Sequence, residues 1–206
     1  MTPSELYGKI SKYLGTCDKK ICDLHSACSP DKGKKYMCVT PASATLVIDF
    51  DKVKEKADRT KGIESRKSVD AVKNTDSGNY FCFIELKSWQ LLILHKGNEK
   101  KIEKQADKYA SDLPVKFMHS MEICKEICGD ENALDGCNLI YILVSDTSPE
   151  KDGLADINAS LTALAGTSSN LNKLCDKLSS DIMKGIPNVE TRYWKCREFD
   201  SEFASL

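Results

Sequence analysis

Residues 80–89 read "YFCFIELKSW", an apolar β-strand that carries two ionisable side chains. Because side chains alternate between the two faces of a strand, Glu85 and Lys87 lie on the same face as Phe83. A carboxylate and an ammonium group therefore project side by side from a strand whose other residues suit a buried core. Such a pair on a buried strand indicates a candidate functional site.

A second acidic residue lies in the strand before this one. Residues 68–74, "SVDAVKN", predict a short strand, and the turn-forming residues "NTDSGN" join it to strand 80–88 as an antiparallel hairpin. Asp70 interrupts the apolar pattern of the first strand, and pairing of the two strands brings it near Glu85. Two carboxylates and the ammonium group of Lys87 are therefore expected to converge.

These three side chains suit metal-assisted hydrolysis of a phosphodiester. Carboxylates are the ligands that Mg²⁺ prefers, and a bound divalent ion polarises the phosphate and lowers the pKa of a coordinated water. A neighbouring lysine can orient or help deprotonate that water and offset the charge that builds in the transition state. No member of the set suits hydride transfer or acyl transfer.

The segments before the hairpin predict a helix and a strand. Helical spacing of Leu6, Ile10 and Leu14 predicts a first helix, with Ser4 as its cap. Residues 44–50 predict a strand by their β-branched content. The highly charged residues 51–67 favour a long exposed loop or a frayed helix.

The segments after strand 80–88 predict a helix, a strand and C-terminal additions. Residues 98–113 have a helical apolar face, and Pro114 is expected to end or restart this helix before a second segment over 115–128. Residues 138–146 form a continuous apolar run, typical of a strand buried on both faces. Residues 154–164 and 168–185 predict two helices, or one broken near Gly166, and 189–199 predict a closing edge strand. The expected fold is an α/β sandwich with a mixed sheet.

Length, charge and cysteine content limit the class of protein. The 206 residues suit one domain over 1–206, and 30 Lys and Arg against 31 Asp and Glu provide no overall charge to hold a polyanion. The N-terminal segment lacks the apolar run of a signal peptide, and no apolar run is long enough to span a bilayer. We therefore expect a cytoplasmic protein with reduced thiols among its ten cysteines and no membrane partner.

Asp70, a hairpin, and then Glu85-Leu86-Lys87 together resemble the PD-(D/E)XK nuclease superfamily, although Val69 stands where that family usually has proline. The resemblance covers about residues 1–145 and implies a restriction-endonuclease-like core of helix, three strands, helix and strand, with 146–206 as a C-terminal addition. It also implies that Asp70 and Glu85 bind Mg²⁺ or Mn²⁺, that the carbonyl of Leu86 adds a ligand, and that Lys87 acts on the attacking water.

The following helix carries a further match. Gln105 and Tyr109 in "QADKY" lie at i and i+4 on one helix face, similar to the Q-x-x-x-Y signature of the RecB-like branch, whose residues support the site and contact DNA. Glu5 resembles an acidic residue that some members contribute from the first helix.

The resemblance as a whole implies a Mg²⁺-dependent deoxyribonuclease that leaves a 5′-phosphate and a 3′-hydroxyl. It also implies an effector of a prokaryotic antiviral defence system, with targeting supplied by a protein partner.

Each of these features also has a purely structural interpretation. Glu85 and Lys87 would then be a surface ion pair on a half-exposed strand, and Asp70 would solvate the end of its strand. Gln105 and Tyr109 would be an ordinary pair on an amphipathic helix. A catalytically inactive scaffold or binding subunit with the same fold is therefore the alternative function, and it predicts no dependence on metal.

Four basic residues precede Asp70 in the sequence. Arg59, Lys61, Arg66 and Lys67 are positioned to contact the phosphates of a nucleic acid beside the site. The alternative is a solvated loop in which acidic residues alternate with these basic ones.

The N-terminal cysteines raise the question of a structural metal. Sulfur and imidazole ligands suit Zn²⁺, but the spacings differ from those of the usual C-x-x-C knuckles. Buried free thiols are the favoured interpretation and structural zinc is the alternative. The residues concerned are Cys17, Cys22, His25, Cys28 and Cys38.

Overall fold

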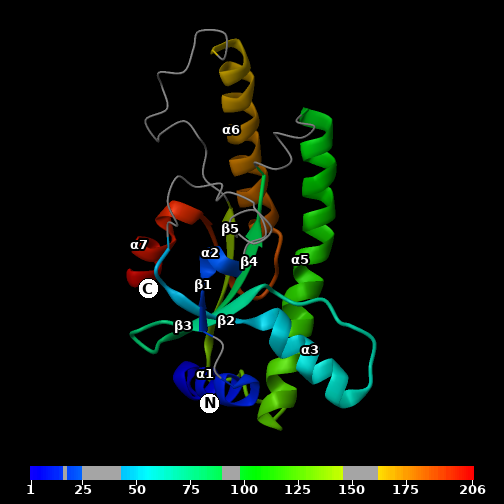
Figure 1. Cartoon of the computed structure of the whole chain (residues 1–206), viewed down its shortest axis with the longest axis vertical. Coiled ribbons are helices and arrows are strands. Elements are labelled where there is room, and N and C mark those ends of the chain that lie inside the picture. The colour runs from blue at the N-terminus through cyan, green and yellow to red at the C-terminus, as the bar shows by residue number, and fades with distance from the viewer. Residues whose placement is uncertain (16–17, 25–42, 90–97, 146–161) are drawn as a thin grey trace.

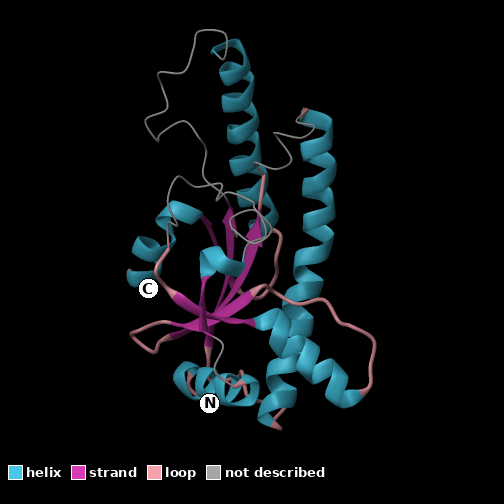
Figure 2. Cartoon of the chain, viewed as in Figure 1, coloured by secondary structure: helices cyan, strands magenta, loops and turns pink. Residues whose placement is uncertain are grey.

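A six-stranded mixed sheet forms the centre of the protein (Figures 1 and 2). The computed structural model describes residues 1–15, 18–24, 43–89, 98–145 and 162–206. The strands lie in the sheet in the order of the sequence: β1 (Asp18–Lys20), β2 (Leu46–Asp49), β3 (Ala71–Asn74), β4 (Tyr80–Lys87), β5 (Asn138–Ser145) and β6 (Glu190–Lys195). The first four pair antiparallel, whereas β4, β5 and β6 are parallel. The predicted α/β class and mixed sheet are confirmed.

Helices cover both faces of this sheet. One face packs against α1 (Pro3–Leu14), α3 (Phe50–Lys61), α5 (Glu99–Cys128) and α6 (Thr162–Lys184), and Figure 1 shows α5 and α6 running alongside each other. The other face packs against α2 (Ile21–Leu24) and α7 (Phe199–Ala204), which follows the 3₁₀ turn η3 (Cys196–Glu198). No helix in the described part of the chain is both long and apolar enough to cross a membrane.

Strand β4 contributes to both cores, as its alternation predicts. Phe81 and Phe83 face the layer of α5, where Phe83 packs edge-on against Phe117 with ring centroids 5.1 Å apart. Cys82 and Ile84 face the smaller core beneath α7. Since neither face of β4 is open to solvent, the ionisable residues at its C-terminal end lie in a largely dehydrated setting.

The hairpin between β3 and β4 forms through the predicted turn, in which Gly78 has a φ of 71°. The first strand is shorter than the predicted 68–74 and begins only after Asp70. The first two residues of the predicted strand form hydrogen bonds with helices instead: the Ser68 hydroxyl donates to Asp51 of α3 at 2.7 Å, and the Val69 N–H donates to the Ser120 hydroxyl of α5 at 3.0 Å. Asp70 therefore stands at the end of the strand.

The charged segment before this hairpin is a regular helix. Asp49 caps α3 by accepting a hydrogen bond from the Lys52 N–H at 3.3 Å, and Gly62, with a φ of 66°, ends the helix. Val53 and Ala57 are buried on its inner side. The sequence predicted a strand that ends at residue 50, but β2 ends at Asp49 because this residue caps α3.

Two further boundary predictions, both for helices, were wrong. Thr2, not Ser4, caps α1: its side chain accepts a hydrogen bond from the Glu5 N–H, while the Glu5 carboxylate accepts one from the Thr2 N–H at 2.8 Å. Glu5 is therefore an exposed capping residue. Helix α5 continues through Pro114 as one element. Proline has no N–H to bond the Ala110 carbonyl, but Ala110 lies on the exposed side of the helix, where water can bond that carbonyl instead.

The C-terminal predictions are confirmed only in part. Helix α6 passes through Gly166 without a break, so the predicted interruption near this glycine was wrong, and residues 154–161 lie outside the described residues. Strand β6 closes the sheet as its edge strand, although it ends at Lys195 and a 3₁₀ turn takes over the rest of the predicted segment 189–199.

Candidate active site

Asp70, Glu85 and Lys87 converge at the C-terminal end of β4. The antiparallel pairing of β3 with β4 places Ala71 opposite Ile84. Asp70, which immediately precedes Ala71, therefore lies beside the C-terminal end of β4, next to Glu85. The Leu86 N–H donates to Asp70 Oδ2 at 2.6 Å, and the Lys87 ammonium group contacts Glu85 Oε1. The hairpin and the alternation of β4 are sufficient to produce this convergence.

A second lysine, which the sequence analysis missed, completes the cluster. Lys116 Nζ lies 2.6 Å from Glu85 Oε1 and 3.9 Å from Asp70 Oδ1, so one ammonium group contacts both carboxylates. Lys116 follows Tyr109 by two helical turns on α5, on the helix face predicted to support the site. This helical spacing from Tyr109 is the sequence feature that could have predicted Lys116 as a member of the site. We call Asp70, Glu85, Lys87 and Lys116 the acid–lysine cluster.

Burial controls the ionisation of the two acids. Glu85 is fully buried, and burial together with the negative charge of Asp70 raises its pKa to about 7, against the pull of the two lysines. Burial also raises the pKa of Asp70, although Lys116, Lys87 and the Leu86 N–H oppose the shift. Burial therefore disfavours the ionised form of both carboxylates more strongly than the two lysines favour it.

The pKa of Lys87 reflects the same balance from the other side. Burial alone would lower it, but the charges of Glu85 and Asp70 outweigh that effect and raise the pKa above its usual value. Lys87 is therefore a cation at neutral pH. Its ammonium group lies 5.1 Å from the centroid of the Tyr109 ring and 3.3 Å from the Leu86 carbonyl oxygen, which accepts a hydrogen bond from it.

One buried oxygen atom of the cluster has no hydrogen-bond donor in the part of the chain that the structure describes. Glu85 Oε2 is buried and has no hydrogen-bond partner among the described residues. A buried acceptor without a partner is costly unless another group binds it, and a cation would satisfy it. With the Asp70 carboxylate and the Leu86 carbonyl, the donors fit Mg²⁺ or Mn²⁺, since Mg²⁺ is usually held by one or two carboxylates and completes its shell with water and substrate oxygens. No group of three or more Asp, Glu, His or Cys side chains suited to a metal occurs in the described part of the chain.

Tyr109 lies beside Lys87 on α5, and both it and Gln105, one turn earlier, are half-buried. The Tyr109 ring packs edge-on against Trp89, with ring centroids 5.3 Å apart, and receives the Lys87 ammonium group over its face. Trp89 Nε1 in turn donates to the Ser179 hydroxyl of α6 at 2.8 Å. The end of β4 is therefore held between α5 and α6, with Lys87 lying over an aromatic ring.

Asp51 is a further acidic neighbour that the sequence analysis did not identify. It lies in the first turn of α3, accepts hydrogen bonds from Ser68 at 2.7 Å and Lys54 at 3.2 Å, and its charge contributes to the raised pKa of Asp70. These two donors hold the Asp51 carboxylate beside the acid–lysine cluster.

The basic residues expected to contact nucleic acid are mostly paired within the protein. Arg66 donates two hydrogen bonds of 2.9 Å to the Glu126 carboxylate, and its Nε donates to Asp58 at 2.7 Å. Lys61 pairs with Glu126 at 2.9 Å and Lys67 with Asp112 at 2.6 Å. Arg66 is therefore a structural link between α3 and α5. Arg59 is exposed on α3.

The predicted zinc ligands are not described. Cys17, His25, Cys28 and Cys38 lie outside the described residues, as does the side chain of Cys22 in α2. The zinc alternative therefore stays a prediction. The described free cysteines are Cys82, Cys124, Cys128, Cys137, Cys175 and Cys196.

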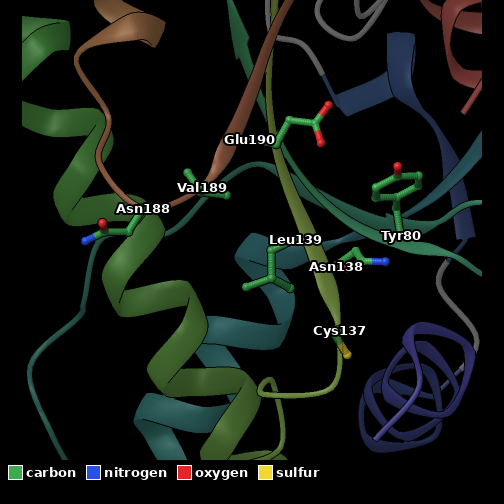
Figure 3. Close-up of a pocket in the computed structure, with 7 residues that line it drawn as sticks. All are labelled: Tyr80, Cys137, Asn138, Leu139, Asn188, Val189 and Glu190. Carbon is green, nitrogen blue, oxygen red and sulfur yellow. The ribbon is translucent and has the colours of Figure 1, made fainter.

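A surface pocket lies at the opposite end of the parallel strands (Figure 3). Tyr80 and Asn138, at the starts of β4 and β5, line it together with Leu139 and Glu190. Glu85 and Lys87 lie at the other end of β4. The pocket shares no residue with the acid–lysine cluster, and its lining lacks a group of convergent charges.

Comparisons of the chain with models of protein families, with curated proteins and with solved structures find no match. The restriction-endonuclease-like core and membership of the nuclease superfamily therefore stay predictions. A function for the chain therefore rests on its side-chain geometry and its sequence motifs.

Proposed function

We propose that the chain is a metal-dependent nuclease that hydrolyses phosphodiester bonds, with DNA as its expected substrate. The observation that carries the proposal is the convergence of Asp70, Glu85 and Lys87, together with the buried Glu85 Oε2, which has no donor among the described residues. Paired acids with raised pKa values, here a fully buried Glu85 beside a half-buried Asp70, occur preferentially at functional sites.

Each residue of the cluster has a distinct role in this proposal. Asp70, Glu85 and the carbonyl of Leu86 would hold Mg²⁺ or Mn²⁺, which when bound polarises the scissile phosphate and lowers the pKa of a coordinated water. Lys87 would orient the attacking water and offset the charge that develops on the phosphate. The Tyr109 ring positions Lys87, and the Leu86 N–H positions Asp70.

The charge distribution supports targeting by a protein partner. The net charge is −1, and Arg66, Lys61 and Lys67 already pair with carboxylates, which leaves little free positive charge among them to hold DNA. Recruitment by a partner would supply the missing affinity. An effector of a prokaryotic antiviral defence system, active in the cytoplasm, is the biological role that this proposal favours.

A catalytically inactive scaffold is the second candidate, and one specific observation favours it. Glu85 Oε1 accepts hydrogen bonds from both Lys87 and Lys116, so two carboxylates face two ammonium groups. The acid–lysine cluster is thus balanced in charge without any added ion. A binding subunit with a structural charge cluster would have this arrangement and would not respond to Mg²⁺.

Cleavage and melting measurements distinguish the two candidates. Linear, circular and single-stranded DNA, and RNA, are incubated with the protein in Mg²⁺, Mn²⁺ or EDTA, and the variants Glu85→Gln and Asp70→Asn are compared with Glu103→Gln, an exposed position on α5. The nuclease should cleave only with a divalent ion, and only Glu103→Gln should keep activity. Cleavage that persists in EDTA or in Glu85→Gln would refute the proposal. Absence of both cleavage and any Mg²⁺-dependent rise in Tm would establish the scaffold.

A further inference from the structure

Helix α5 holds Lys116 against both acids of the cluster. Its ammonium nitrogen is 2.6 Å from Glu85 Oε1 and 3.9 Å from Asp70 Oδ1, and its side chain is only 21% exposed. The contact with Glu85 is to the same oxygen that accepts from Lys87, whereas Glu85 Oε2 has no partner among the described residues. Lys116 therefore contacts the two carboxylates to which the divalent ion is assigned.

A buried serine fixes the backbone of α5 at this point. The Ser120 hydroxyl donates to the Lys116 carbonyl at 2.8 Å and accepts from the Val69 N–H at 3.0 Å. Val69 immediately precedes Asp70, and Ser120 is fully buried. One hydroxyl thus links the helical turn that bears Lys116 to the segment that bears Asp70. This packing fixes the position of the Lys116 backbone, and the ammonium group is held at the carboxylates by its contacts with Glu85 and Asp70.

An ammonium group in contact with the two carboxylates that would bind a divalent ion opposes the entry of that ion. Both cations need the same negative charge, and at separations near 4 Å like charges repel strongly in a site that is largely screened from water. Lys116 supplies one of the two ammonium groups that the described residues place at Glu85. The same ammonium group therefore stabilises the protein without metal and weakens its affinity for metal.

We propose that Lys116 is a built-in counter-ion of the candidate metal site, which neutralises Asp70 and Glu85 in the metal-free protein and must withdraw when the ion binds. In this role it is a positioning residue that sets the metal affinity. The inference rests on the proposed function, because it requires Asp70 and Glu85 to be metal ligands.

Calorimetric titration of the full chain with Mn²⁺ tests this role. Lys116→Met removes the charge and keeps most of the apolar stem, Lys116→Arg keeps the charge, and Lys104→Met removes one charge from an exposed position of the same helix. Lys116→Met should bind Mn²⁺ at least about tenfold more tightly than the wild type, since a unit charge at this distance contributes on the order of 4 kcal/mol even at an effective dielectric constant near 20, about a thousandfold in affinity before screening. Lys116→Arg and Lys104→Met should bind like the wild type.

Melting curves of the same proteins supply the second measurement. Lys116→Met should melt below the wild type in EDTA and should gain more from Mn²⁺ than the wild type does, because the ion replaces the lost counter-charge. A purely structural lysine would lower Tm in EDTA without changing the Mn²⁺ affinity. If Lys116→Met is too unstable to titrate in EDTA, Lys116→Gln, which keeps a hydrogen-bond donor, takes its place.

The outcomes separate this inference from the proposed function. If the wild type binds Mn²⁺ and Lys116→Met binds it with equal or weaker affinity, the counter-ion role is overturned and the metal site stays intact. Binding by Lys116→Met but not by the wild type supports the role, because the lysine then excludes the ion altogether. No binding by any of these proteins overturns the metal site, the proposed nuclease and the counter-ion role together. Glu85→Gln, as the control for the site, should abolish binding.

Discussion

Glu85→Gln removes a fully buried titratable group at almost constant size, and it should remove one part of the pH dependence of stability. The pKa of Glu85 is raised from 4.5 to about 7, first by burial and then by the charge of Asp70. The folded chain therefore holds this proton more tightly than the unfolded chain does. Below about pH 4.5 both states carry the proton, and above about pH 7 neither does. Stability should therefore fall as the pH rises between these limits.

The size of this effect follows from the same pKa. One pKa unit corresponds to about 1.4 kcal/mol, so the interval from 4.5 to about 7 corresponds to roughly 3 kcal/mol of unfolding free energy. A marginally stable domain has on the order of 5 to 15 kcal/mol in total, so the loss is readily measured. Mg²⁺ should reverse it in the wild type, because the ion binds the ionised carboxylate and stabilises the folded state.

Urea unfolding in EDTA between pH 4.5 and pH 8 measures this prediction. The unfolding free energy of the wild type minus that of Glu85→Gln should decrease by roughly 3 kcal/mol as the pH rises from about 4.5 to about 7. Glu103→Gln, at an exposed position on α5, should give no such change. A difference between wild type and Glu85→Gln that stays constant with pH, or that grows as the pH rises, would refute the assignment of Glu85 as a buried, under-compensated acid.

Lys87→Ala should keep Mn²⁺ binding in calorimetry but lower the cleavage rate by roughly 10² to 10⁴, because it removes the group that orients the water; loss of metal binding would contradict that role. Tyr109→Phe keeps the ring beneath the Lys87 ammonium group, so Tyr109→Ala, which removes it, should cost roughly 2 kcal/mol more of unfolding free energy in urea than Tyr109→Phe does. Equal effects of these two variants would show that the ring is not the stabilising part. Arg66→Ala should cost about 3 kcal/mol, because it leaves Asp58 and Glu126 without their shared partner, and a change in the salt dependence of DNA binding with no loss of Tm would show instead that Arg66 contacts phosphate.

Local sequence signals were sufficient for the elements that bear the predicted site. The turn residues 74–79 specify a hairpin, and strand alternation places Glu85 and Lys87 on one face, so the convergence with Asp70 depends only on neighbouring segments. The mixed sheet was predictable from the order of apolar runs for a similar reason. Element boundaries were less predictable, because caps compete for the same residues: Thr2 caps α1 in place of Ser4. Pro114 remains inside α5 because the carbonyl it leaves unpaired faces solvent.

The charges that complete the site depended on tertiary packing. Lys116 lies 31 residues from Glu85 in the sequence, and it reaches the carboxylates only because the apolar face of α5 docks against β4 and Ser120 ties the helix to Val69. The sequence by itself determined which ionisable groups the hairpin would bring together, since that depends on strand periodicity. It did not determine how deeply Glu85 is buried or which lysines compensate it, because burial and ion pairing depend on distances between segments remote in the chain, and the raised pKa values follow from those distances.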